Sequence, residues 1–187
     1  MAVYNTSSDA ANTAVRAYLT RIGEYYLKRG FNTGTGKGQQ DWHKIRDRVF
    51  EGKCAYCGTS DGKLQIEHLI MFNREEFGLH HPGNIVPACQ TCNKRSKTND
   101  NKYVSWEEHL TFICKNNKTL DKFHERWSKI NEHFKKGEFK YPELTFEEKK
   151  AISIIANNLY ESVKNEFEQA VKLFQELDNA FTKKADK

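Results

Sequence analysis

The sequence contains no long hydrophobic run. Its densest aliphatic cluster lies around Ile152, Ile154 and Ile155, far short of the roughly 18 apolar residues that a membrane-spanning helix needs. Residues 1–13 show neither the basic start nor the apolar stretch of a secretory signal. We therefore expect a soluble protein of the cytoplasm.

The apolar fraction of the chain is low. Of the 187 residues, 37% are hydrophobic and 29% are charged, and the mean hydropathy is −0.83. A chain of this length suffices for one compact domain, or for a small domain with helical attachments. Its apolar core must be modest, so we expect a further source of stability besides apolar burial.

The net charge of +5 is concentrated in the first 104 residues. Residues 1–40 hold five Lys or Arg against two Asp or Glu, residues 41–104 hold ten against eight, and residues 105–187 hold fifteen of each. A basic half suits an anionic partner such as nucleic acid, although a mildly basic protein without such a partner fits the charge equally well.

Four of the five cysteines form two closely spaced pairs, Cys54-Ala-Tyr-Cys57 and Cys89-Gln-Thr-Cys92. In a reducing cytosol, C-x-x-C pairs separated by tens of residues predict one tetrahedral zinc site, because each spacer lets both sulfurs reach the same ion. Two disulfides, or a redox-active C-x-x-C, are the alternatives. Neither accounts for the presence of two such pairs.

Helical periodicity predicts one helix over residues 8–29 and another over residues 42–50. The Gly-rich segment 30–38 between them superficially resembles a phosphate-binding loop. The Walker pattern fails, because Lys37 is followed by another glycine and position 31 carries none. We expect a mobile linker here, with contact between Lys37 and a phosphate backbone as the alternative.

Residues 63–68 alternate as in a strand, and the second cysteine pair is expected to open a short helix that reaches residue 97. After residue 104 the pattern is helical, with capping boxes that begin at Ser105 and Thr145. Cys114 falls in the first of these helices and is expected to pack as a small apolar residue. One face of the last helix carries an apolar stripe: Ile152, Ile155, Leu159, Val163, Phe167, Val171, Phe174, Leu177 and Phe181.

Between the cysteine pairs lies an ordered set of polar residues. Glu67-His68 ends the predicted strand, Asn84 precedes the second pair, and Asn93 directly follows its last cysteine. In this order, together with the two C-x-x-C pairs, the sequence resembles the HNH nucleases, the ββα-metal family, in their zinc-stapled form. The resemblance covers about residues 42–97.

The resemblance implies an α+β fold: a small ββα-metal nuclease core with structural zinc, flanked by N-terminal helices and a mostly helical C-terminal region. It also implies a metal-dependent DNA endonuclease that hydrolyses phosphodiester bonds. In the family pattern Glu67 and Asn93 are ligands of the catalytic metal, His68 is the general base, and Asn84 orients the histidine and its loop by hydrogen bonding.

Elementary chemistry agrees with these roles. Glu67 and His68 are adjacent, so in an extended chain one side chain can hold a metal while the other faces water and phosphate. Asn93 stands where many relatives have histidine, and Glu67 where many have aspartate. Oxygen ligands at both positions favour Mg²⁺ or Mn²⁺ over a catalytic zinc. His80 and His81 are rival ligands, for which loop or phosphate-contact roles are favoured.

Three basic residues, Lys94, Arg95 and Lys97, follow on the predicted short helix, where they would face the same phosphate as the metal. A solvated charged face is the alternative interpretation. The expected substrate is DNA, most simply double-stranded.

Other functions share parts of this pattern. A catalytically inactive zinc-dependent DNA- or RNA-binding module needs the cysteines but not the ordered polar residues. A zinc deaminase is excluded, because its H-x-E and P-C-x-x-C motifs are absent. A structural adaptor built on the long C-terminal helix remains an additional role.

We predict three regions: an N-terminal helix with a Gly-rich loop (1–40), the HNH core (41–104) and a helical C-terminal region (105–187). The stripe on the last helix is explained either by intramolecular packing or by a homodimer. A restriction or phage-defence nuclease fits a compact chain of this kind best.

Overall fold

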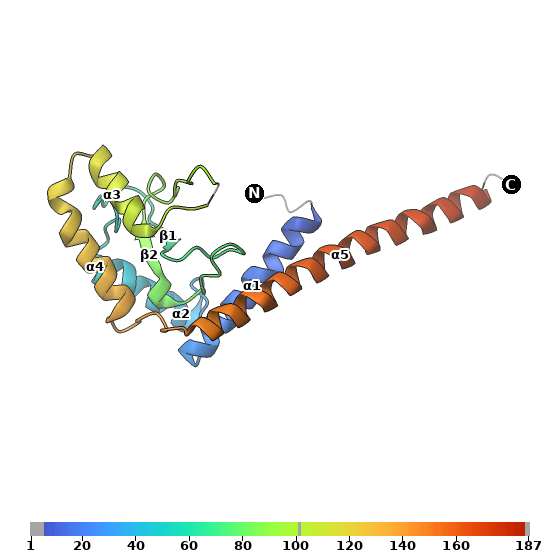
Figure 1. Cartoon of the computed structure of the whole chain (residues 1–187), viewed down its shortest axis with the longest axis horizontal. Helices are drawn as coiled ribbons and strands as arrows, with labels where there is room; N and C mark the ends of the chain where they lie inside the picture. Colours follow the sequence, from blue (N-terminus) through green and yellow to red (C-terminus); the bar gives the residue numbers. More distant parts are fainter. Residues whose placement is uncertain (1–5, 101, 186–187) are drawn as a thin grey trace.

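The computed structural model describes residues 6–100 and 102–185. A small two-stranded sheet lies at one end, helices surround it, and a long C-terminal helix projects away from it (Figure 1). None of the helices in the described part of the chain combines the length and apolar character that a membrane span needs. The mixture of helices with a small antiparallel sheet confirms the α+β class.

The sheet consists of β1 (Gln65–His68) and β2 (Ile85–Ala88), which pair antiparallel with Glu67 opposite Val86 and His68 opposite Ile85. The 16 residues that join them end in the 3₁₀ turn η2 (Pro82–Asn84). All four residues of β2 are buried. The predicted strand over 63–68 is thus confirmed, with two residues fewer at its start.

On the N-terminal side, α1 (Ser7–Leu27) confirms the first predicted helix and starts with a capping box at Thr6 and Asp9. The second helix starts earlier than predicted: α2 (Gly36–His43) continues into a π-helical segment η1 (Lys44–Val49). The last third of the predicted linker, residues 36–38, is therefore helical. Gly38 makes this possible, because the backbone of Asn32 packs so close that a Cβ would not fit.

The helix predicted after the second cysteine pair is absent. Residues from Cys89 to Lys94 form turns, and Lys97 then makes an isolated antiparallel bridge with Tyr103. The physical reason is a long-range contact: the side chain of Arg95 turns inward to an ion pair with Glu67. A regular helix through residue 97 would form only if it also left the side chain of Arg95 within reach of Glu67.

The C-terminal region contains α3 (Trp106–Asn116), η3 (Leu120–Lys122), α4 (Phe123–Lys135) and α5 (Phe146–Ala185). Both predicted capping boxes are present, at Ser105 with Glu108 and at Thr145 with Glu148. Cys114 is fully buried, as expected of a packed apolar residue.

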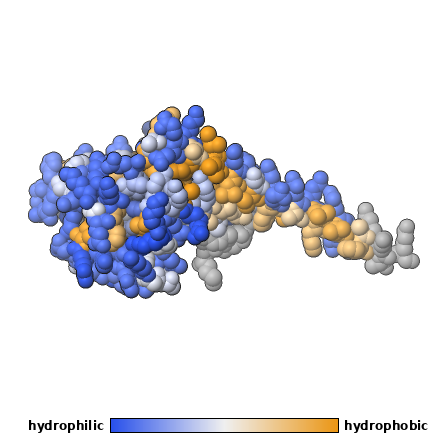
Figure 2. All heavy atoms as spheres, turned by 90° about the horizontal axis from the view of Figure 1, so that it is seen from below, coloured by the Kyte–Doolittle hydropathy of each residue, from blue (hydrophilic) through white to orange (hydrophobic). Residues whose placement is uncertain are grey.

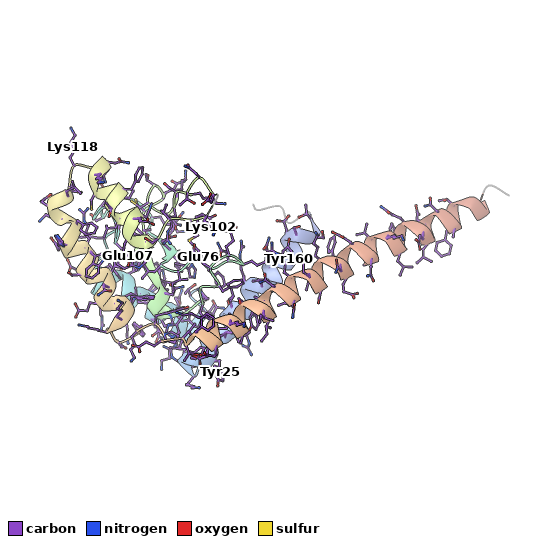
Figure 3. The ribbon with its side chains drawn as sticks, viewed as in Figure 1. Tyr25, Glu76, Lys102, Glu107, Lys118 and Tyr160 are labelled. Carbon is purple, nitrogen blue, oxygen red and sulfur yellow. The ribbon has the colours of Figure 1, made fainter. Side chains whose placement is uncertain are left out.

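Two apolar clusters hold these elements together. The first surrounds the sheet and the cysteines and includes Tyr56, Ile85 and Leu110. The second joins α1 to α5 through residues such as Leu19, Ala156 and Tyr160. Tyr160 lies on the part of α5 that runs beside α1 (Figure 3). α1 and the first half of α5 therefore form one helical pair.

Candidate metal centre and active site

The four paired cysteines converge on one point between the sheet and α3. Their Sγ atoms all lie within 4.8 Å of one another, and the Sγ atoms of Cys57 and Cys89 are 3.8 Å apart. Tetrahedral zinc with Zn–S bonds of about 2.3 Å requires sulfurs about 3.8 Å apart. The cluster fits a zinc ion, and all four cysteines are free of disulfides.

Local backbone hydrogen bonds shape the first cysteine pair. The amide of Gly58 donates to the carbonyl of Cys54 over 2.9 Å, and Gly58 adopts a left-handed φ of +78° that favours glycine. The amide of Ala55 donates to Pro87 in β2 over 2.8 Å. This bond fixes the cysteine turn to the strand that precedes the second pair.

The thiols of the cluster influence one another's ionisation. Contacts with Cys57 and Cys92 lower the pKa of Cys54, whereas the same contact with Cys54 raises the pKa of Cys92. Four thiolates in one cluster repel one another unless a cation lies between them. A bound Zn²⁺ would stabilise all four in the ionised form.

His68 lies at the C-terminal end of β1, on the face away from Glu67. Its Nε2 lies 3.0 Å from Nδ1 of His80, so one ring donates a hydrogen bond to the other. Phe72 stacks on His68 with ring centroids 4.9 Å apart. Burial is the main cause that lowers the pKa of His68 to about 3 and that of His80 to about 4. Both rings are therefore neutral at pH 7.

His68 and His80 line an open surface cavity of about 480 Å³. The opposite wall comes from α1 and the segment after it, through Thr20, Glu24 and Phe31. The helix approaches closely because Gly23 faces the carbonyl of His80, where a Cβ would collide with the backbone. The N-terminal helix is therefore part of the candidate site, although nothing in its sequence indicates this.

Asn84 holds the loop that carries His80. Its Oδ1 accepts from the amide of Ile70 over 2.8 Å, and its Nδ2 donates to the carbonyls of Ile70 and Leu79, each over 2.9 Å. The side chain is completely buried. All three bonds fix the chain that directly follows His68 and the residue that precedes His80, which is compatible with the orienting role expected of Asn84.

Glu67 points to the other face of β1, into the protein. Its Oε1 accepts from Nη2 of Arg95 over 2.6 Å, and the two side chains are 7% and 1% exposed. The same guanidinium donates to the carbonyls of His68 and Leu69 over 2.8 and 2.9 Å. Burial raises the pKa of Glu67, and the charge of Arg95 acts in the opposite direction.

Arg95 is therefore unavailable to a phosphate in this structure, in contrast to the sequence-based expectation. Lys37, Lys94 and Lys97 are exposed, and the Nζ of Lys97 lies over the ring of Tyr103. These three lysines remain candidates for nucleic-acid contact.

Glu67 and Asn93, the expected ligands of a catalytic divalent cation, each contact another side chain. The Nδ2 of Asn93 donates to the side chain of Gln65 over 2.7 Å, and Glu67 is paired with Arg95. Within residues 6–100 and 102–185, the cysteine cluster is the only group of three or more His, Cys, Asp or Glu ligands that gathers this closely. The guanidinium of Arg95 supplies the positive charge beside Glu67 in this structure.

The structure thus brings His68, Asn84 and His80 together and places Glu67 and Asn93 elsewhere. Sequence reasoning did not find the contact between His68 and His80 or the role of Arg95. Both are long-range contacts inside irregular segments, where no periodicity relates the partners.

The HNH endonuclease family matches residues 54–99 of this chain. The match includes all four clustered cysteines, His68, His80 and Asn84. Comparison with curated proteins and with solved structures finds no match to the chain.

Proposed function

Because residues 54–99 form an HNH endonuclease domain, we propose that this protein is a metal-dependent DNA endonuclease in which His68 is the general base. Phosphodiester hydrolysis requires an activated water, and a neutral imidazole beside an open cavity can take its proton. The position of His68 at the mouth of that cavity, within the HNH domain, is the observation that carries the proposal.

His80 supports this assignment through its position. A hydrogen bond over 3.0 Å restrains the ring of His68, and Asn84 fixes the loop on both sides. We assign Asn84 a positioning role, because it touches the backbone of the site and not the cavity.

Dependence on Mg²⁺ or Mn²⁺ is part of the proposal and rests on the family pattern. A bound divalent cation would stabilise charge on the phosphate and on the leaving oxygen. Glu67 and Asn93 are the assigned ligands, and Glu67 can serve only when Arg95 releases it. Structural Zn²⁺ at the four cysteines would hold the domain together whether or not catalysis occurs.

The ion pair between Glu67 and Arg95 favours one alternative, a catalytically inactive zinc-dependent module that binds DNA or RNA. Such a module would keep the zinc cluster and the exposed lysines but would not need Glu67 as a ligand. Binding without cleavage would distinguish the two functions.

The decisive experiment incubates zinc-loaded protein with supercoiled plasmid, with no added cation, with Mg²⁺ or with Mn²⁺. We expect cation-dependent cleavage by the native protein and a loss of at least a hundredfold in His68→Ala, the usual contribution of a general base. His124→Ala, a change outside the HNH domain, is the matched control. Equal traces of cleavage in the native protein and His68→Ala would refute the nuclease.

The cellular role is a separate proposal. We favour a restriction or phage-defence nuclease in the cytoplasm that cleaves double-stranded DNA, built from a core at 41–104 with helical regions at 1–40 and 105–187. Sequencing of the ends of cleaved genomic DNA would test it, because a restriction enzyme leaves ends at one recurrent sequence.

A homodimer through the C-terminal helix would give such an enzyme two active sites, one for each strand of DNA.

A further inference from the structure

The second half of α5 has no partner among the described residues. α1 runs antiparallel to the first half: the hydroxyl of Tyr26 donates to Glu148, and the hydroxyl of Ser7 donates to Glu168. At 1.5 Å per residue, residues 169–185 extend about 25 Å beyond this pairing. Figure 2 shows apolar side chains along one side of the projecting helix.

Two series of apolar residues run along α5 with a spacing of seven. Aromatic residues occupy positions 160, 167, 174 and 181, and smaller apolar residues occupy 156, 163, 170 and 177. The steps between the series alternate between four and three, which is the a/d pattern of a coiled coil. We name residues 163–181 of this pattern the α5 seam: Val163, Phe167, Ala170, Phe174, Leu177 and Phe181.

The seam continues an interface that already exists. Ala156 and Tyr160, which belong to the same two series, are buried against α1. Along α5, toward the point where α1 begins and beyond it, the exposed fraction of the aromatic residues rises from 8% at Tyr160 to 42% at Phe167 and 69% at Phe174. The same stripe is therefore covered in one half and open in the other. The covered and open stripe does not include Ile155, which the sequence analysis placed in the apolar stripe. Ile155 is half exposed on another side of α5.

We propose that the α5 seam pairs with the α5 seam of a second copy of this chain as an antiparallel two-helix coiled coil. The second copy is the occupant that fits, because it brings a helix with the same spacing of seven and the same length of uncovered stripe. This inference is independent of the proposed nuclease activity.

The antiparallel direction follows from α1 and from side-chain size. α1 already lies antiparallel on the first half of α5. The α5 helix of a second copy, if also antiparallel, would continue along α5 from the point where α1 begins. The C-terminal end of the second helix then meets the start of α1. In this register Phe174 of one copy faces Leu177 of the other, and Ala170 faces Phe181. Both of these layers combine a large side chain with a smaller one, whereas a parallel pair would place alanine against alanine and phenylalanine against phenylalanine.

The area is sufficient for a stable pair. A covered phenylalanine buries roughly 150–250 Å², and the three rings of the seam are each 42–69% exposed in one copy. In the register above, Phe174, Leu177 and Phe181 of both copies face one another, and Phe167 lies beside the end of the second helix. Together these side chains would bury on the order of 900 Å², which is close to the minimum for a specific interface.

Sedimentation equilibrium of the full-length, zinc-loaded protein over a wide range of concentration tests the pairing. The expected mass rises from that of one chain, 21.8 kDa, to that of two. Phe174→Glu should remain a single chain, because it places a charge in the seam. Gln175→Glu adds the same charge on the polar side and should behave like the native protein. Circular dichroism checks that both variants keep their helices.

A native protein that stays a single chain at every concentration would overturn the proposal, as would a native assembly of three or more chains. Equal dimerisation of Phe174→Glu and Gln175→Glu would overturn it too, because the interface would then lie elsewhere.

Spin labels test the direction. Labels at Gln175→Cys should lie almost opposite each other in the pair, whereas labels at Gln169→Cys should be offset along the axis by thirteen residues, about 20 Å. Equal label distances for the two variants would mean a parallel pair and would refute the antiparallel arrangement. The native cysteines are protected, since four belong to the cluster and Cys114 is buried.

Discussion

At the scale of single residues, the pair of Glu67 and Arg95 distinguishes this structure from the family pattern. A carboxylate expected to hold a metal is instead neutralised by a guanidinium that also binds the carbonyls of His68 and Leu69. Arg95 thus fixes the end of β1, and the last residue of that strand is the candidate base His68. The same cationic group would compete with a metal ion for the carboxylate of Glu67.

Removal of Arg95 should be costly. We expect Arg95→Met to lower the free energy of unfolding by about 3–5 kcal/mol, because it leaves a buried carboxylate without a partner. The loss should shrink as the pH falls, since the pKa of Glu67 is already raised by burial and its neutral form is then more easily populated. Urea denaturation at several pH values measures both effects.

Two variants serve as controls for this prediction. Glu67→Gln combined with Arg95→Met should recover part of the loss. Arg46→Met, which breaks the exposed pair with Asp47, should cost less than about 1 kcal/mol. A cost of that small size for Arg95→Met would show that the buried pair does not stabilise the fold.

At the scale of secondary-structure elements, the candidate site depends on how α1 lies against the loop that carries His80. Gly23 is the point of contact, and no Cβ fits between α1 and the carbonyl of His80. The helix also supplies Thr20 and Glu24 to the cavity wall. Its position therefore influences the site, although it lies about 45 residues before His68 in the sequence.

Gly23→Ala should separate α1 from the loop. We expect a loss of about 1–3 kcal/mol in the free energy of unfolding, the usual cost of overpacking, together with changed NMR signals of the His68 and His80 rings. Gly30→Ala is the control, because the nearest atom to its Cβ is a carboxylate oxygen of Glu24 at 3.7 Å. Identical ring signals in Gly23→Ala and the native protein would contradict this role of α1.

The two cysteine turns form the second structural unit that the site requires. Removal of zinc should lower the stability by at least about 4 kcal/mol when free zinc exceeds its dissociation constant a thousandfold. For a chain of this size the corresponding fall in Tm is roughly 8–16 °C. Calorimetry with and without a chelator, together with metal analysis, measures the effect.

The Cys92→Ser variant should have a lower Tm than the native protein without chelator, and adding chelator should change its Tm little. The Tm of the Cys114→Ala variant should fall with chelator as in the native protein. The absence of zinc from the intact protein would contradict the assignment of the cluster.

At the scale of the whole molecule, the HNH domain is compact while α5 projects from it (Figure 1). If two copies pair through the α5 seam, their HNH domains lie at opposite ends of a helical rod. Each domain could then act on its own DNA strand or on its own DNA molecule. Under the proposed nuclease function, the geometry of the proposed pair would affect the products of cleavage.

The proposed pairing predicts the products from a plasmid. We expect the native protein to convert supercoiled plasmid to the linear form, and Phe174→Glu to accumulate several-fold more nicked circle, because a single chain carries one active site. Gel electrophoresis over time, with Gln175→Glu as the control, measures the ratio. The same ratio of nicked to linear DNA in all three proteins would show that self-association does not affect cleavage.

The sequence by itself determined the parts whose partners are close in the chain or follow a regular spacing. The C-x-x-C pairs predicted the cysteine cluster, because a two-residue spacer fixes both sulfurs locally. The capping boxes at Ser105 and Thr145, the strand before His68 and the first helix follow from local hydrogen bonding and periodicity. The order of Glu67, His68, Asn84 and Asn93 indicated the HNH domain.

Only the tertiary structure decided which of these residues meet. Adjacent side chains on β1 point to opposite faces, and which face is open depends on helices far away in the sequence. For this reason Glu67 is paired with Arg95, the predicted helix after Cys92 is replaced by turns, and His68 faces His80 and α1. Likewise, the spacing of seven along α5 is visible in the sequence, but only the length of α1 shows where its seam becomes exposed.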